Sequence, residues 1–179
     1  LFGLGKGLLI VSFTGASPWS VLAQGISLNV NLSIGTITLL ISIAVLILWI
    51  PLGQRPGMGT IFNALIIALM IDLCIKFIPT PSNYFHQLIL AVVSVITVGI
   101  GGGIYLVSNL GAGPRDGLMI GLQKLTNFPI AGVRAILEIS VVSVGWYLGG
   151  TVGLGTLFFA FGIGPCVALG LYLVGQIFN

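Results

Sequence analysis

Charged residues are scarce in this sequence: only 5% of its 179 residues are Asp, Glu, Lys or Arg, while 57% are hydrophobic. A soluble domain carries about 25% charged residues, so a soluble globular domain is excluded, and the mean hydropathy of +1.21 agrees. Several apolar runs reach about the 20 residues needed to cross a hydrocarbon core, and they lack the alternation of transmembrane barrel strands. The composition therefore predicts an all-α, polytopic transmembrane bundle whose surroundings are the lipid bilayer.

The residues from which active sites and metal centres are built are equally few. The chain has three Asp or Glu, one His and two Cys, and Cys74 and Cys166 lie in separate apolar runs. It has no phosphate-binding Gly-rich loop ending in Lys-Ser/Thr, no His-Glu-x-x-His and no Gly-x-Ser-x-Gly. We therefore expect no enzyme, no catalytic residues, no metal and no cofactor. The net charge of +3 is read as a topology signal, so nucleic acid is not an expected partner.

A proline motif occurs twice in the chain. Residues 110–119 read LGAGPRDGLM and residues 15–22 read GASPWSVL, with Trp19-Ser20 where the later copy has Arg115-Asp116. The separation of 96 residues between the two motifs continues without a gap through both halves of the sequence. It pairs Gly3, Gly5 and Gly7 with Gly99, Gly101 and Gly103, Asn31 with Asn127, Gly53 with Gly149, and Gly59-Thr60 with Gly155-Thr156. Such a register indicates a duplicated membrane protein.

Each half is predicted to hold three spans and one short helix, within one membrane domain. The repeats are residues 1–84 and 85–179, and the first span ends at Ser12 or Ser108. The segments after the proline motifs, residues 17–27 and 114–125, are too short to cross and are expected to be broken or re-entrant helices. The remaining spans are expected at residues 32–50, 58–79, 129–148 and 154–178. Three is an odd number, so the second repeat should enter the membrane inverted relative to the first.

The positive charges suggest an orientation. Six spans place both termini on one side, and the offset implies that the first span begins before Leu1, as expected of a trimmed N-terminus. The side of the termini is expected to hold Arg55, Arg115, Lys124 and Arg134, and the opposite side Lys76 and Lys6. Because Lys and Arg favour the cytoplasmic side, cytoplasmic termini are predicted.

Three motifs carry a resemblance to a known family. The segments 110–119 (LGAGPRDGLM), 51–60 (PLGQRPGMGT) and 149–156 (GGTVGLGT) together resemble the YczE-like group of bacterial inner-membrane proteins, relatives of the YitT family. The resemblance covers nearly the whole chain. It implies a small multi-span protein of the bacterial inner membrane, some of whose relatives are described as candidate exporters. It supplies no substrate and no residue set.

Glu138 is predicted to lie close to the middle of the hydrocarbon core, which is about 30 Å thick. It is nine residues into its span, roughly 13 Å along a helix that rises about 1.5 Å per residue. An ionisable group there is costly and marks a functional hypothesis with a partner to be named. Arg134, one turn earlier on the same face, is that partner. The alternative is a buried ion pair that only holds helices in register.

Arg115 and Asp116 open the short helix of the second repeat. One interpretation is an interfacial cap, with Arg115 as a cytoplasmic anchor. The other places this helix start inside the bundle, where free N–H groups and Arg115 face an anionic or polar solute. Ser17, Trp19 and Ser20 would then form the facing half-site, and the unequal charge of the two halves would suit an amphipathic substrate.

Asp72 and Lys76 form an acid-then-base pair at helical spacing. Their place near the end of a span favours a pair at the membrane surface. Asn63 either lines a path or bonds between helices.

These features favour a small-molecule secondary transporter or exporter with a charged site in the second repeat: Arg115, Asp116, Arg134, Glu138, Ser17, Trp19 and Ser20. The alternative is a non-transporting scaffold or accessory subunit of another enzyme system, whose charges only set helix register. A cavity that reaches the charges favours transport, and a solid core with an apolar lateral groove favours the partner role. A channel would need a ring of like charges, which this chain supplies only as a homo-oligomer.

Overall fold

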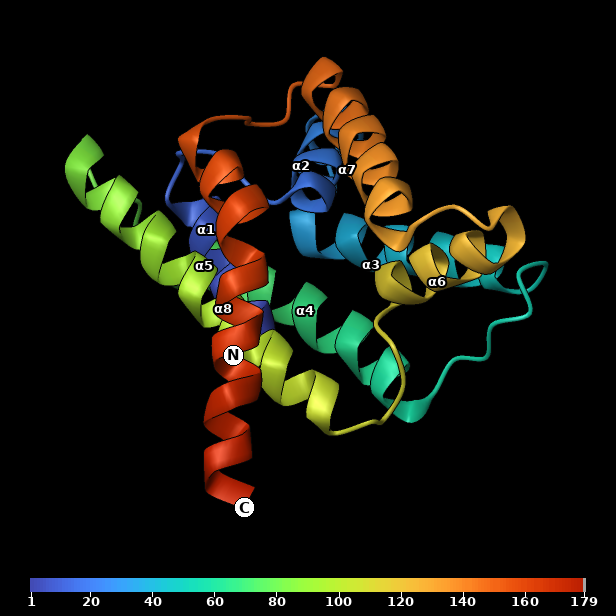
Figure 1. Ribbon diagram of the computed structural model, residues 1–179. Coiled ribbons are helices and arrows are strands. Elements are labelled where there is room, and N and C mark those ends of the chain that lie inside the picture. Colours follow the sequence, from blue (N-terminus) through green and yellow to red (C-terminus); the bar gives the residue numbers. More distant parts are fainter. Residues whose placement is uncertain (179) are drawn as a thin grey trace.

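The structure, a computed structural model, describes the backbone of residues 1–178 as an assembly of helices (Figure 1). No strand occurs in this range. The helices are α1 (Phe2–Val11), α2 (Pro18–Val30), α3 (Ile34–Trp49), α4 (Met58–Phe77), α5 (Tyr84–Val107), α6 (Pro114–Thr126), α7 (Ile130–Tyr147) and α8 (Leu154–Phe178). The all-α class predicted from composition is confirmed.

Prolines and asparagines set the ends of the two short helices. Pro18 and Pro114 occupy the first turns of α2 and α6, where a fixed φ and a missing N–H are tolerated. Both helices end at an asparagine in the left-handed conformation, Asn31 at φ 53° and Asn127 at φ 55°. Asparagine adopts this conformation more readily than most residues, so each short helix stops and the chain turns into the next one.

The helix boundaries of the two halves coincide once 96 residues are added. The starts of α2, α3 and α4 become those of α6, α7 and α8, and the end of α1 becomes the end of α5. Left-handed backbone conformations repeat as well: Phe13 with Asn109, Gly15 with Gly111, Asn31 with Asn127 and Gly53 with Gly149. The two segments therefore share turn geometry as well as sequence.

Four helices, α4, α5, α7 and α8, are long and apolar enough to cross a membrane. The helices α2 and α3 together are also long and apolar enough, but they meet at 114°. They add a fifth crossing only if this bent pair counts as one broken span. The sequence predicts six. The difference arises from α1 and α3, whose helical parts are only 10 and 16 residues long, short of the roughly 20 that a full crossing needs.

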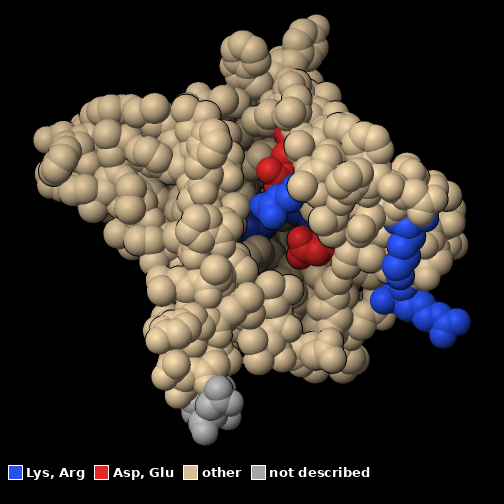
Figure 2. Space-filling view, viewed as in Figure 1, with Lys and Arg blue, Asp and Glu red and all other residues tan. Residues whose placement is uncertain are grey.

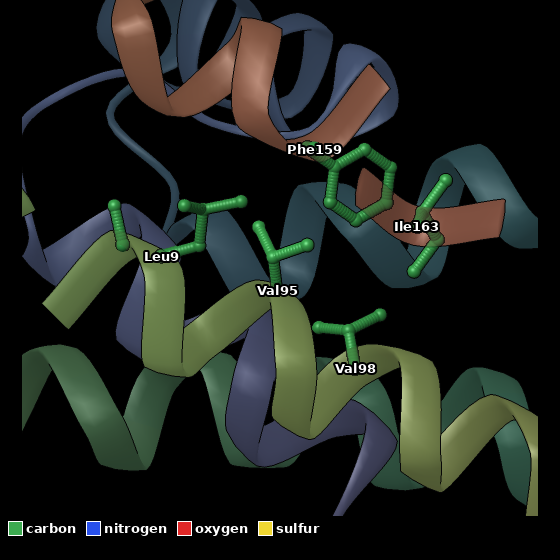
Figure 3. Close-up of a cluster of buried hydrophobic side chains, with 6 residues drawn as sticks. Leu9, Val95, Val98, Phe159 and Ile163 are labelled. Atoms are coloured by element: carbon green, nitrogen blue, oxygen red, sulfur yellow. The ribbon is translucent and has the colours of Figure 1, made fainter. Parts of the chain in front are cut away.

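Close helix contacts run through the middle of the molecule. Leu9 of α1, Val95 and Val98 of α5, and Phe159 and Ile163 of α8 point toward one another in one buried cluster (Figure 3). These helices approach closely because they present glycines: a Cβ on Gly5 would lie 2.7 Å from the Val98 side chain, and one on Gly103 would lie 2.7 Å from the α8 backbone. Small residues at helix crossings are the usual packing device of membrane proteins.

The third and fourth helices of the first half are joined by a carboxylate. Asp72 of α4 accepts hydrogen bonds from the Ser33 hydroxyl at 2.6 Å and the Gly35 N–H at 2.7 Å, at the start of α3, where free N–H groups favour an anion. The expected surface pair with Lys76 is therefore wrong: the carboxylate of Asp72 caps a neighbouring helix instead.

The corresponding helices of the second half lack this joint. The positions equivalent to Asp72, Ser33 and Gly35 are Ala168, Pro129 and Ala131, none of which supplies the carboxylate or the hydroxyl. In the part of the chain that the structure describes, α3 packs along α4, whereas α7 and α8 barely approach one another. Figure 1 shows α7 and α8 diverging from the loop that joins them.

Candidate functional site

A cavity of about 260 Å³ lies where the two halves meet. Figure 2 shows acidic and basic side chains gathered in a hollow of the surface, between the positions that α8 and α7 occupy in Figure 1. Many lining residues are equivalent pairs of the two halves: Ser17 with Gly113, Pro18 with Pro114, Trp19 with Arg115, Thr38 with Arg134, Ser42 with Glu138, Asn63 with Phe159, and Ile67 with Ile163. Corresponding faces of the two segments therefore enclose one shared space.

The starts of α2 and α6 meet at this cavity. The Arg115 guanidinium lies 5.1 Å from the centre of the Trp19 ring, a cation–π arrangement between two equivalent positions. Trp49 of α3 fixes the start of α6, because its indole N–H donates to the Pro114 carbonyl at 2.8 Å. The start of α6 therefore lies at the cavity beside the start of α2, and the role of Arg115, as an interfacial anchor or as a solute ligand, stays a prediction.

Arg134 and Glu138 line the cavity from α7. The Arg134 Nε lies 3.0 Å from the Glu138 Oε1, and the two side chains are 47% and 21% exposed. It is the one ion pair within the chain described by the structure. The predicted partnership of these residues is therefore present at the cavity.

Asp116 lies in the first turn of α6 beside Gly113, where a Cβ added to the glycine would be 2.9 Å from the Asp116 Oδ2. The positive end of the helix dipole stabilises a carboxylate in this place. Asp116 and Arg115 both line the cavity, but no ion pair joins them in the described residues.

Lys6 is the charged residue whose predicted position differs from the structure. It was expected near the membrane surface, but its side chain is 4% exposed and lines the cavity from α1. Its Nζ lies 4.6 Å from the centre of the Phe2 ring. A single lysine between Gly5 and Gly7 resembles a topology signal. Only the close crossing of α1 with α5 shows that it is buried at the cavity.

The remaining predicted residues divide. Ser17 and Trp19 line the cavity, as does Asn63. Ser20 does not line it, because its hydroxyl points to the Ser17 hydroxyl at 2.8 Å within the start of α2. The charged site is also not confined to the second half, since Lys6 belongs to the first.

A family model described as "Family of unknown function (DUF6198)" matches residues 1–171, which include every lining residue of the cavity. The chain belongs to this family. The resemblance to YczE-like membrane proteins, predicted from three motifs, is confirmed by this match and by the YczE relative described next.

Three proteins from two bacteria are similar to this chain. An uncharacterized protein of Haemophilus influenzae (strain Rd) is 42% identical over 99% of this chain and 81% of its own length. The uncharacterized membrane protein YczE of Bacillus subtilis (strain 168) is 29% identical over 84% of this chain and 75% of its own. The uncharacterized protein YyaS of the same bacterium is 27% identical over 88% and 80%. No solved structure matches the chain.

Proposed function

We propose that this membrane protein is a small secondary transporter of the bacterial inner membrane. The observation that carries the proposal is the position of the cavity: it lies between the two proline helix starts and is lined by five charged side chains, Lys6, Arg115, Asp116, Arg134 and Glu138. Ionisable groups inside a membrane bundle are expensive and mark solute or proton pathways. A bundle crevice at the meeting of two half-helices is where carriers of repeated architecture bind their solutes.

The proposal includes two inverted three-helix repeats, residues 1–84 and 85–179, with six spans formed by α1, α3, α4, α5, α7 and α8. Reciprocal hydrogen bonds support it. The Gly59 N–H donates to the Leu110 carbonyl at 2.9 Å, and the Gly155 N–H donates to the Thr14 carbonyl at 2.9 Å. Each bond joins one half to the other, and adding or subtracting 96 residues converts one into the other. A two-fold relation between the halves produces this reciprocity. With an even number of spans, both termini are proposed to face the cytoplasm.

Alternating exposure follows from the unequal packing of the halves. α3 is held to α4 by Asp72, whereas α7 stands away from α8 and has only Val133 and Gly145 buried. If the halves are related by two-fold rotation, exchanging their conformations gives a second state, with α7 packed against α8 and α3 away from α4. Repeats that exchange conformations in this way expose one site to opposite sides in turn.

The roles follow from the chemistry of the lining. Arg115, Trp19 and Ser17 contact the solute, and Glu138, paired with Arg134, exchanges the coupling proton. We propose no bond-making chemistry for the chain.

The accessory-subunit alternative has one observation in its favour. Trp146 and Tyr147 at the end of α7 are 68% and 90% exposed, which gives a partner or a second copy an apolar surface to contact. A scaffold, however, needs no cavity that changes its exposure, and this difference separates the two functions.

Cysteine labelling tests the proposed function. Thr38 lines the cavity from α3, although its side chain is only 1% exposed. If the cavity opens to each side in turn, Thr38→Cys in a Cys74→Ala, Cys166→Ala background should react with a membrane-impermeant maleimide from both sides of sealed vesicles. Ser94→Cys is the matched control, because Ser94 is equally buried and does not line the cavity; it should react from neither side. Labelling of Thr38→Cys from one side alone would favour a static scaffold.

A further inference from the structure

We propose that the cavity binds the head group of a monoanionic amphiphile, with Lys6, Arg115 and the Trp19 indole as its donors. This proposal rests on the proposed function and names the substrate class of the same site.

The cations that line the cavity outnumber its carboxylates. Lys6 is 4% exposed and lines the cavity, and no ion pair engages its ammonium group within the described residues. The Arg115 guanidinium likewise forms no ion pair there and contacts the Trp19 ring. A cation held inside a bundle is costly unless a partner of opposite charge is supplied.

The indole N–H of Trp19 lacks a hydrogen-bond acceptor. Trp19 is 7% exposed and lines the cavity, and its Nε1 is the one buried side-chain N or O atom of the described chain that has no hydrogen-bond partner. Buried indole N–H groups usually find an acceptor. Trp49, by contrast, has its acceptor in the Pro114 carbonyl. An indole N–H without an acceptor, beside two cations without an ion-pair partner, points to a ligand that brings anionic acceptor oxygens.

The charge balance sets the class of head group. The lining carries three cations, Lys6, Arg115 and Arg134, against two carboxylates, Asp116 and Glu138. Arg134 and Glu138 neutralise one another at 3.0 Å, so one positive charge remains, with the positive ends of α2 and α6 beside it. A carboxylate, a sulfonate or a phosphodiester, each with a single negative charge, fits this balance better than a dianion.

The apolar tail follows from the rest of the lining. Phe159, Ile163 and Val167 of α8 also line the cavity. Beyond them α7 and α8 are separated, and the charged hollow is visible from outside between these helices (Figure 2). The exposed side chains of both helices include many large apolar ones, among them Ile136 and Ile139 of α7 and Phe161 and Leu169 of α8. In this proposal the opening therefore faces the hydrocarbon of the bilayer, from which an amphiphile enters with its tail still in lipid.

Decanesulfonate is a suitable probe, since it is a permanent monoanion with an apolar tail. Added to the purified protein in neutral detergent, it should raise the thermal unfolding temperature with a saturating dose dependence, as ligands of the folded state do. Lys6→Met should keep the fold and weaken the apparent affinity for decanesulfonate about tenfold or more, the effect expected for loss of one charge-assisted hydrogen bond. Arg115→Gln provides a second variant if Lys6→Met does not fold.

Matched probes and a control variant separate the parts of the proposal. Methanesulfonate lacks the tail, decanol lacks the charge and decyltrimethylammonium reverses it, so each should bind at least about tenfold more weakly. Lys76→Met carries the same substitution on α4, at a lysine that does not line the cavity, and should bind decanesulfonate as the wild type does. Decanoate and a decyl phosphodiester then show which monoanionic head binds more tightly.

The proposal would be overturned if Lys6→Met and Arg115→Gln responded to decanesulfonate as the wild type does. It would also be overturned if the wild type bound decanol as tightly as decanesulfonate. Thr38→Cys labelling from both sides would still support transport of another solute, so the two failures are distinguishable.

Discussion

Exchanging Glu138 for glutamine is expected to abolish the uptake of decanesulfonate that a pH gradient drives into proteoliposomes, while the protein still folds. Glu138 is the carboxylate that lines the cavity from α7, and its partner Arg134 lies 3.0 Å away. Glutamine keeps the size and hydrogen-bonding capacity of the side chain but cannot exchange a proton. Arg134 is left unpaired, so the cavity gains one net positive charge beside Lys6 and Arg115. We expect gradient-driven uptake to fall to the level of empty liposomes.

Glu138→Asp is the matched control, because it keeps a titratable carboxyl group on the same helix face. Its uptake should keep a dependence on the pH gradient, although at a reduced rate. Binding of decanesulfonate by Glu138→Gln, followed by thermal unfolding, shows whether the solute site survives. If Glu138→Gln transports with an undiminished response to the pH gradient, Glu138 has no part in coupling, and the Arg134 pair only holds α7 in place.

Replacing Gly117 by alanine is expected to have the largest effect on stability. A Cβ at this position would overlap the ring of Trp49, which is 2% exposed and donates its indole hydrogen bond to the Pro114 carbonyl. The ring must move, and its movement breaks that bond and releases the start of α6. Overpacking and an orphaned buried donor each cost roughly 1–3 kcal/mol, so a loss of about 2 kcal/mol or more is expected.

The matched control is Gly175→Ala, since a Cβ at Gly175 in α8 meets nothing within 4 Å. Alanine there should raise helix stability by roughly 0.5–1 kcal/mol. Thermal unfolding in detergent should therefore move in opposite directions for the two variants. A Gly117→Ala protein as stable as the wild type would mean that Trp49 does not lie against α6.

The sequence predicted the parts of this structure that depend on apolar runs, proline motifs and helical spacing. The apolar runs indicated α4, α5, α7 and α8, and the offset between the proline motifs placed Pro18 and Pro114 at the starts of α2 and α6. The spacing of Arg134 and Glu138 gave their ion pair, because residues four apart share a helix face.

The sequence could not predict what depends on helix crossings. Lys6 was expected at the surface, and only the packing of α1 against α5 through Gly5 shows that it is buried. Asp72 was paired with Lys76 on its own helix, whereas its partners, Ser33 and Gly35, are nearly 40 residues away in the chain. Local spacing carries no information on such distant partners. The separation of α7 from α8 likewise reflects the lack of hydrogen bonds like those between Asp72 and the start of α3. No sequence motif indicates that lack.

If the two halves exchange conformations around the charged cavity, the distance between α7 and α8 must change, and measuring that distance is the most direct test. Ala131 and Ala168, the equivalents of Gly35 and Asp72, lie far from the loop that joins these helices. Spin labels attached at Ala131→Cys and Ala168→Cys, in the Cys74→Ala, Cys166→Ala background, report this distance by double electron–electron resonance in nanodiscs. Two populations are expected, one with a long distance in which α7 stands away from α8 and one with a short distance in which the helices pack, and their ratio should shift when decanesulfonate is added. A single distance that no solute or pH changes would contradict this exchange of conformations.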